Sequence, residues 1–438
     1  MKLRIFQSDK GDCLLLQSRD GKNVLCDGGM ARAYRAHARH LLPDLIGDGG
    51  RLDYVYVSHI DQDHISGVLQ LLNDALDWKV FDHHQQNGVS SVREPDFPRP
   101  AAIGGLWHNS FRDQVGDNAG PIGDLLAASV PVLYGSAVPD LVDMAHDAEN
   151  IANSIPEALK VSRICKPDLL DVVVNEFPGS AGPAKLLYFR DQPQSFHVGD
   201  LKFTIIGPTE RELDDLRQGW NNWLNDPEKN SVAKVRAEMK KRVEAFAAGQ
   251  FVGSPFDLRN WNGVKDFEGV TVPNVASLMF MVEEDDKKLL LTGDGQQDKI
   301  LDGLDAAGFL DNGHLHVDVL KIQHHGSEHN MDRDFARKVS ADHYVFCGDG
   351  SHGNPEPEVL DIVFKSRIGP ASRRALAPEA EDRRFKFWFS TRADKLPTQS
   401  AKRRNFEEVE AKIGNWESEH GDRFSAEWVA RDYRTLTI

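Results

Sequence analysis

The sequence lacks the features that define several classes of protein. Its 438 residues contain no long apolar run, and the most notable one, residues 278–282, is far shorter than the roughly 20 residues that cross a bilayer. The first residues, MKLRIFQSDKGD, do not combine a charged start, an apolar segment and a small-residue cleavage site. We therefore expect neither a membrane protein nor an exported one.

Cysteine is also scarce. The four cysteines, Cys13, Cys26, Cys165 and Cys347, are scattered and form no C-x-x-C pair. Three of them lie in apolar, strand-like runs, where a thiol behaves as a small apolar side chain. We expect reduced, mostly buried thiols in a cytoplasmic protein.

Positive charge is in deficit as well. Lysine and arginine number 52 against 68 aspartates and glutamates, which gives a net charge of −16. Proteins coated in nucleic acid usually present a net basic face, so this balance argues against that class and leaves open only a local basic groove. Apolar residues make up 40% of the chain, enough for a large core and too many for wholesale disorder.

Short apolar runs recur along the chain, and several of them end abruptly in polar residues. The runs that predict strands lead into Asp27, His59, Asp294 and His324, and amphipathic segments between them predict helices. In α/β proteins, sites are built where strands end. We therefore expect these polar residues to share one edge of a mixed α/β fold.

The densest group of such residues is Ser58-His-Ile-Asp-Gln-Asp-His64. Four side chains that can bind a metal lie within six residues, directly after an apolar strand. Imidazole and carboxylate suit zinc, manganese or iron. On an extended loop, alternating spacing would send His59, Asp61 and Asp63 to one side and His64 in a second direction, so that two metals could share the loop. The alternative, a solvated acidic turn with incidental histidines, fits this density poorly.

Two further strand ends offer the same kinds of ligand. The strand before Thr292-Gly293-Asp294 ends in a carboxylate that could bridge two cations, although a single Asp in a turn is usually structural. Another strand ends in His324 and His325, of which one could lie in the core and one at the surface. Together, the three strand ends make a shared metal site the better interpretation.

Taken jointly, these motifs resemble the metallo-β-lactamase fold superfamily, whose hallmark is H-x-H-x-D-H after a strand, then Asp after Gly, then a final His. The variant here resembles one branch, the soluble domain of competence-type DNA-uptake proteins and its free-standing relatives. The segments that carry the resemblance cover roughly residues 1–80 and 196–391; they are Gly11-Asp12, Asp27-Gly28-Gly29, His59 to His64, Asn274 with Ser277-Leu278, Leu290 to Asp294, and Leu320-Lys321 with His324 to Ser327.

The resemblance implies a fold and a domain organisation. It implies an α/β (α+β) four-layer αββα sandwich with two mixed sheets packed face to face. We expect the hydrolase domain to span residues 1–391, with insertions at 82–195 and 210–265, and a helical extension to follow at 392–438.

The resemblance also implies roles for individual residues. His59 and Asp61 would hold one metal, and Asp294 would bridge it to a second. Asp63, His64 and one of His324 and His325 would hold the second metal, with His325 preferred as the ligand and His324 facing the substrate. Asp63 would also orient the attacking water, and Asp27 would orient a ligand imidazole.

Two departures from the superfamily pattern bear on the metal. Asp61 replaces an imidazole, and the third histidine has no counterpart, because Asn274 and Ser277 stand in that region. Both changes make the first position richer in oxygen, which moves its preference from zinc toward manganese, with magnesium possible. We expect two divalent metal ions.

The reaction that we predict is hydrolysis of a phosphodiester, including nucleic acid, by hydroxide generated near neutral pH. Arg383 and Arg384, beside aromatic residues, are candidates for binding the substrate, as are the basic run 402–404 and the loop residues His352 and Asn354. Two alternatives stay open: a hydrolase of a small phosphoester, nucleotide or ester, and a catalytically degenerate interaction module. The sequence does not settle a protein partner or an oligomeric state.

Overall fold

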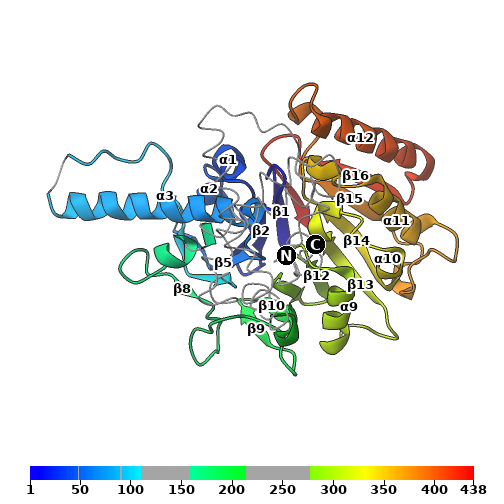
Figure 1. Ribbon diagram of the computed structural model, residues 1–438, viewed down its shortest axis with the longest axis horizontal. Coiled ribbons are helices and arrows are strands. Elements are labelled where there is room, and N and C mark those ends of the chain that lie inside the picture. The colour runs from blue at the N-terminus through cyan, green and yellow to red at the C-terminus, as the bar shows by residue number, and fades with distance from the viewer. Residues whose placement is uncertain (48, 89–90, 110–156, 159, 214–276) are drawn as a thin grey trace, which may run out of the picture.

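Two β-sheets face each other and helices cover both outer sides, as the computed structural model shows (Figure 1). The structure describes residues 1–47, 49–88, 91–109, 157–158, 160–213 and 277–438. Much of the predicted 82–195 insertion and most of the predicted 210–265 insertion lie outside these residues, as does Asn274.

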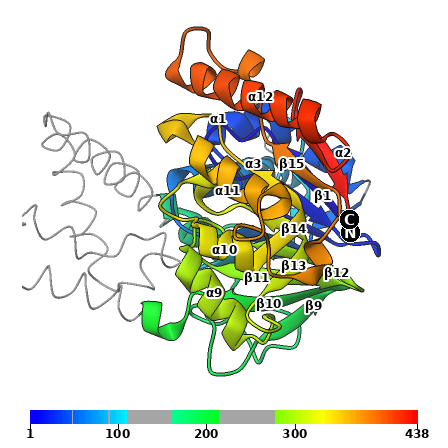
Figure 2. The same cartoon turned by 90° about the vertical axis from the view of Figure 1, so that its right-hand side faces the viewer.

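The first sheet has seven strands and contains both ends of the chain. In spatial order they are β17 (Tyr433–Thr437), β1 (Lys2–Phe6), β2 (Leu14–Gln17), β3 (Asn23–Cys26), β5 (Tyr54–Val57), β7 (Gly105–His108) and β8 (Val173–Val174). Strands β3, β5, β7 and β8 run parallel to one another. In the other half of the sheet, from β17 through β1 and β2 to β3, each strand runs antiparallel to its neighbour. The pairing of β1 with β17 brings the two termini side by side (Figure 2).

The second sheet has eight strands. In spatial order they are β16 (Phe424–Trp428), β15 (Phe385–Phe389), β14 (Val339–Phe346), β13 (Leu315–Lys321), β12 (Lys287–Leu291), β11 (Met279–Glu284), β10 (Leu201–Gly207) and β9 (Ser195–Val198). The five strands from β12 to β16 run parallel, so their C-terminal ends form one edge. A small separate sheet pairs β4 (Arg51–Leu52) with β6 (Ala102–Ile103).

The apolar runs of the sequence fit this arrangement because many strands are covered on both faces. Leu14 and Leu16 of β2 pack between the two sheets, whereas Leu15 packs in the cluster on the outer side with α3. Successive side chains on a strand point to opposite faces, so a strand buried on both sides needs a continuous apolar run. Each buried leucine of this kind contributes roughly 2 kcal/mol of hydrophobic free energy.

Helices complete the outer layers. The first sheet is covered by α1 (Ala31–Ala33), the π-helical turn Tyr34–Ala38, α2 (Leu42–Ile46) and the long α3 (Gln62–Gln86). The second sheet is covered by α9 (Gln297–Ala306), α10 (Arg333–Lys338), α11 (Pro357–Ile368) and α12 (Ala401–His420). Short 3₁₀ turns span Gln323–Gly326, Ser351–Gly353, Pro378–Ala380 and Ala393–Lys395. Mixed sheets with helices outside make the α+β fold that the sequence predicts.

Two local expectations differ from the structure. The segment between Asp27 and His59, one of those for which helices are predicted, does not form one helix but is divided into α1, the π-helical turn and α2. The tail forms the expected outer helix, α12, but continues into β16 and β17, which join different sheets. The tail is therefore integrated into both layers of the sandwich. Within the described residues, every helix is too short or too polar to span a bilayer.

Candidate metal centre

The predicted ligands meet where strands of both sheets end. His59 follows β5, Asp294 follows β12 and His325 follows β13, while Asp27 follows β3. These four residues are between 2% and 6% exposed, so the group is almost entirely buried. The predicted edge therefore brings together residues that lie more than 250 positions apart in the sequence.

The His59–His64 segment is not the extended loop that its alternating spacing predicted. Helix α3 begins at Gln62 with Asp61 as its N-cap residue, so Asp63 and His64 lie in the first helical turn. An acidic residue in a first turn is favoured by the helix dipole, which offsets the absence of a side-chain cap. Gly11 makes room for this turn, because a Cβ there would lie 1.6 Å from the carbonyl oxygen of Asp63.

Asp294 is the centre of the group. Its Oδ2 lies 3.4 Å from Nε2 of His64, 3.4 Å from Nε2 of His325 and 3.6 Å from Nε2 of His59. These separations exceed those of good hydrogen bonds. They match the spacing of about 3.4 Å that two ligands take when each lies about 2.1 Å from a shared tetrahedral cation.

The two remaining carboxylates lie on opposite sides of Asp294. Asp61 Oδ2 is 3.6 Å from Nε2 of His59, and Asp63 Oδ2 is 3.3 Å from Nε2 of His325. His59, His64 and Asp294 also form one group whose potential ligand atoms all lie within 4.8 Å of one another, so the division of these residues between two metals stays a prediction.

Hydrogen bonds behind the histidines set their tautomers. Nδ1 of His325 lies 2.9 Å from the carbonyl oxygen of Cys347, which can only accept, so Nδ1 carries the proton. Nδ1 of His64 lies 2.9 Å from Asp27 Oδ2. The Ser58 hydroxyl donates to the same carboxylate at 2.7 Å and so accepts from Nδ1 of His59 at 3.0 Å. All three Nε2 lone pairs therefore point toward Asp294.

The inward-facing atoms fit a bound cation. Nε2 of His59, Nε2 of His64, Nε2 of His325 and Asp61 Oδ1 are buried and have no hydrogen-bond partner among the described residues. Buried polar atoms in native proteins are normally satisfied. Imidazole nitrogens and carboxylate oxygens that converge without partners are the donor set of a divalent metal site.

Charge balance supports the same interpretation. Five buried carboxylates (Asp12, Asp27, Asp61, Asp63 and Asp294) and one buried ammonium (Lys321) leave four negative charges when the imidazoles are neutral. Burial alone would lower the pKa of His64, but Asp294, Asp27 and Asp12 raise it well above its usual value. Two divalent cations would supply the four compensating charges and keep the imidazole nitrogens free to coordinate.

Asp12 and Lys321 form a buried support whose role sequence reasoning missed. Lys321 Nζ contacts Asp12 Oδ2 and donates to the carbonyl oxygen of Gly293 at 2.9 Å. Asp12 Oδ1 lies 3.3 Å from Nδ1 of His325. Burial alone would raise the pKa of Asp12, but Lys321, His64 and His325 lower it. Asp12, His64 and His325 are also close enough together to hold a metal ion. The Asp12 carboxylate is, however, already paired with the Lys321 ammonium.

Three predicted substrate-facing residues lie around an open cavity next to the ligands. His324, His352 and Asn354 line a cavity of about 200 Å³ that also exposes Lys10 and Asp294. Nδ1 of His324 lies 2.6 Å from Asn330 Oδ1, and its Nε2 is 3.9 Å from Asp294 Oδ2. His324 is the more exposed of the two neighbouring histidines, so the geometry favours His325 as the ligand.

Arg383 and Arg384 do not lie at this cavity. They precede β15, whose C-terminal residue Phe389 is the end nearest the site, so the strand separates them from it by roughly 15–20 Å. Arg383 pairs instead with Asp342 at 2.8 Å, at the opposite edge of the sheet. Because these arginines stand before an apolar strand and not after it, their order in the sequence already indicated that edge.

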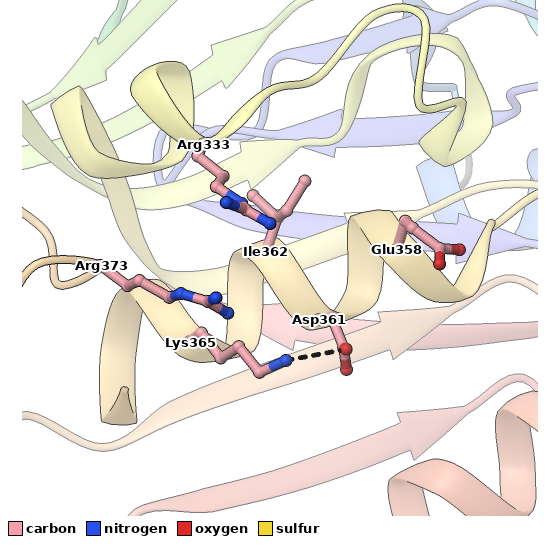
Figure 3. Close-up of a pocket in the computed structure, with 6 residues that line it drawn as sticks. All are labelled: Arg333, Glu358, Asp361, Ile362, Lys365 and Arg373. Atoms are coloured by element: carbon pink, nitrogen blue, oxygen red, sulfur yellow. Dashed lines mark hydrogen bonds and ion pairs between the residues drawn. The ribbon is translucent and has the colours of Figure 1, made fainter. Parts of the chain in front are cut away.

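A second hollow lies on the outer surface between α10 and α11 (Figure 3). Arg333 and Arg373 extend toward Ile362 there, while Lys365 turns to Asp361 at 2.9 Å. The described residues that line it include no imidazole. It therefore lacks the donor set of the interior site.

Comparison with known proteins agrees with this geometry. The family described as Metallo-beta-lactamase superfamily matches the chain over residues 9–75, a segment that includes Asp12, Asp27 and the His59–His64 motif. A search among curated proteins finds no match. The mixed α/β architecture is consistent with the metallo-β-lactamase fold, and the match together with the His/Asp groups indicates a metal-dependent hydrolase.

Proposed function

We propose that this protein is a hydrolase of phosphodiesters that uses two divalent metal ions. The observation that carries the proposal is the convergence of three Nε2 atoms on Asp294 Oδ2, within 3.4–3.6 Å, with their other nitrogens held by hydrogen bonds. When bound, two such cations supply Lewis acidity to the scissile ester and lower the pKa of a water so that it can attack near neutral pH.

Each residue has a distinct task in this proposal. His59 and Asp61 would hold one cation, Asp63, His64 and His325 the other, and Asp294 both. Asp63 also borders the cavity, where its second carboxylate oxygen can orient a water toward a substrate. His324 lines the same cavity, and because its Nδ1 donates to Asn330 Oδ1, its Nε2 is left to accept a hydrogen bond or a proton from a water or the substrate.

The residues around the cavity support an anionic substrate. Lys10, His324, His329 and His352 border it, whereas Arg383 and Arg384 do not. The carboxylates that also line it are the proposed ligands Asp61, Asp63 and Asp294, together with Asp349, which is paired with Lys402, and Glu356. A phosphodiester carries one negative charge, which the basic residues can bind next to the metals. The resemblance to the DNA-uptake branch supports the same substrate class.

The small volume of the cavity favours a second, narrower candidate. A cavity of about 200 Å³ is small for a ligand site, since such sites usually measure roughly 300–1,000 Å³. A small phosphodiester, a nucleotide or the end of a single strand would therefore fit better than double-stranded DNA. Comparing these substrates at equal concentration distinguishes the two candidates.

The test is metal content and cleavage in wild type and Asp294→Ala. We expect wild type purified without chelator to contain about two metal ions per chain by elemental analysis, as two-metal sites do. It should cleave a chromogenic phosphodiester with Mn²⁺ or Zn²⁺, and Asp294→Ala should lose both properties with an unchanged circular dichroism spectrum.

The matched control is Asp298→Ala, which removes an exposed carboxylate four residues away in α9. It should keep metal and activity. A wild-type protein that binds no metal and cleaves no substrate would overturn the proposal and favour an interaction module.

A further inference from the structure

The loop that carries His352 and Asn354 to the cavity is held by the C-terminal helix. Residues 348–354 connect β14 to α11 and contribute five residues to the cavity lining (Gly348, Asp349, Ser351, His352 and Asn354). Helix α12 lies across this region at the top of the molecule (Figure 2). The two segments are about 50 residues apart in sequence and meet at the first turn of the helix.

Two side chains near the start of α12 form hydrogen bonds with the loop. Lys402 Nζ donates to Asp349 Oδ2 at 2.6 Å, and Asn405 Nδ2 donates to the carbonyl oxygen of Gly353 at 2.8 Å. Asp349 is 4% exposed, and its other oxygen accepts from the backbone and the hydroxyl of Ser351 at 3.0 and 2.6 Å. The ion pair therefore reaches through Asp349 into the middle of the loop.

The loop needs such support because its backbone is strained. His352 has a φ of +57°, a left-handed conformation that side chains other than glycine seldom adopt. Gly350 has a φ of +81°, and a Cβ there would lie 2.6 Å from the carbonyl oxygen of Lys402. The loop and the helix therefore touch backbone to backbone, and the contact allows no substitution at Gly350.

The far end of α12 is fixed by the sandwich itself. Trp416, in its last turns, stacks on Phe364 of α11 with 4.0 Å between the ring centroids, and the strand after the helix, β16, pairs with β15 in the second sheet. The first turn of the helix is capped by Ser400, whose hydroxyl accepts from the amide of Arg403 at 3.1 Å. A rigid helix with a fixed end can hold a strained loop in place.

We propose that Lys402 and Asn405 are positioning residues: the first turn of α12 clamps the 349–354 loop so that His352 and Asn354 face the substrate beside the metals. The inference rests on the proposed function for its substrate, and it gives the C-terminal segment a place in the active site. Of the basic run 402–404 that the sequence offered as contacts for the substrate, Lys402 binds the loop instead, and neither Arg403 nor Arg404 lines the cavity.

The test compares Lys402→Met with Arg403→Met in the full-length protein. Both remove one positive charge from the same helical turn, but Arg403 pairs with Glu407 at 2.9 Å on the helix itself. We expect Lys402→Met to raise KM for the chromogenic phosphodiester about tenfold, the loss typical of one charge-assisted hydrogen bond, with kcat within about twofold. Lys402→Arg should restore KM, Arg403→Met should leave it unchanged, and metal content should stay the same in all variants.

A second measurement does not depend on activity. Amides of Gly353 and Asn354 are hydrogen-bonded within the loop, so hydrogen exchange of a peptide covering 349–354 reports its order. Exchange should rise about tenfold in Lys402→Met and in Asn405→Ala, and stay unchanged in Arg403→Met and in peptides covering 59–64. If the wild-type protein cleaves no substrate but hydrogen exchange of the 349–354 peptide changes in this way, the proposed function is wrong and the proposed role of Lys402 and Asn405 is supported. The proposal is overturned if hydrogen exchange of this peptide is unchanged in Lys402→Met, or if the enzyme is active and Lys402→Met leaves its KM unchanged.

Discussion

At the scale of single residues, Asp27 lies one hydrogen bond behind the proposed metal ligands His59 and His64. It accepts from the amide and the hydroxyl of Ser58, both at 2.7 Å, and contacts Nδ1 of His64 at 2.9 Å. Through Ser58 it also orients His59. One carboxylate thus sets the direction of an imidazole in each of the two ligand sets, and its negative charge makes both rings better donors.

Replacing Asp27 with Asn should weaken metal binding without unfolding the protein. Asn keeps the size of the side chain and tolerates the left-handed φ of +56° at this position. We expect a loss of about 10- to 100-fold in affinity for Zn²⁺, measured by competition with a chromophoric chelator. Asp53→Asn is the control, since Asp53 is a buried carboxylate that binds the amide of Asn23 away from the site. Equal effects of the two variants would mean that general destabilisation, not ligand orientation, is responsible.

His108 gives the molecule a pH dependence that is independent of the metals. Burial lowers the pKa of this histidine to about 4 from its usual 6.5. Between pH 6.5 and pH 4 this histidine is protonated in the unfolded chain but neutral in the folded one. Its contribution to the free energy of unfolding is therefore complete above pH 6.5 and falls as the pH drops toward 4. The expected loss from this one group is about 2 kcal/mol between pH 7 and pH 5.

The measurement is urea unfolding of wild type and His108→Gln at both pH values. Gln cannot take up the proton, so the variant should lose about 2 kcal/mol less than wild type on going from pH 7 to pH 5. An identical loss in the two proteins would show that His108 is not the group that titrates.

At the scale of elements, the position of α3 depends on a contact between two glycines. A Cβ at Gly67 would lie 1.9 Å from the carbonyl oxygen of Gly28, and a Cβ at Gly28 would lie 2.3 Å from the amide of Val68. The helix therefore crosses the turn after β3 at backbone contact. This close approach places the first turn, with Asp63 and His64, against the ends of the strands.

Gly67→Ala should disturb both the packing and the site. The new methyl group must push α3 away from Gly28, which we expect to cost about 1–3 kcal/mol and to lower metal content, because the helix carries two ligands. Gly414→Ala is the matched control, since nothing lies within 4 Å of a Cβ there and alanine favours a helix over glycine by about 1 kcal/mol. Thermal unfolding and elemental analysis of the two variants check the prediction, and full metal content in Gly67→Ala would contradict it.

Elements could be predicted from the sequence where local patterns decide them. The strands that lead to Asp27, His59 and Asp294 are apolar runs with polar ends, and a turn at Asp285 joins β11 and β12 into a hairpin. The start of α3 could not be predicted from spacing, because a helical turn and an extended loop both fit the order of the ligands. Strand β17 could not either, since its partner β1 lies at the other end of the chain.

At the scale of the whole molecule, the site is assembled by contacts between distant parts of the chain. The ion pair of Asp12 with Lys321 joins the two sheets, and the clamp of Lys402 on Asp349 joins the tail to the site. The sequence contains these residues but not their pairing, which follows from the packing of one sheet on the other. The candidate site residues at strand ends can therefore be predicted from local sequence, whereas the distant residues that hold them in place cannot.

The distribution of charge over the molecule gives the last prediction. The chain carries a net charge of −16, so an anionic substrate must be drawn in by cations close to the metals. Lys10 borders the cavity, whereas Arg383 and Arg384 lie at the opposite edge of the sheet, beyond the screening length of about 8 Å at physiological salt. Lys10→Ala should therefore raise KM for a phosphodiester several-fold, with a smaller effect at high salt, and Arg383→Ala with Arg384→Ala should leave KM unchanged at every ionic strength. The measurement is steady-state kinetics of both variants at about 0.05 and 0.5 M salt. An increase in KM in the double arginine variant but not in Lys10→Ala would contradict the prediction, because the substrate would then have to extend across the whole sheet to Arg383.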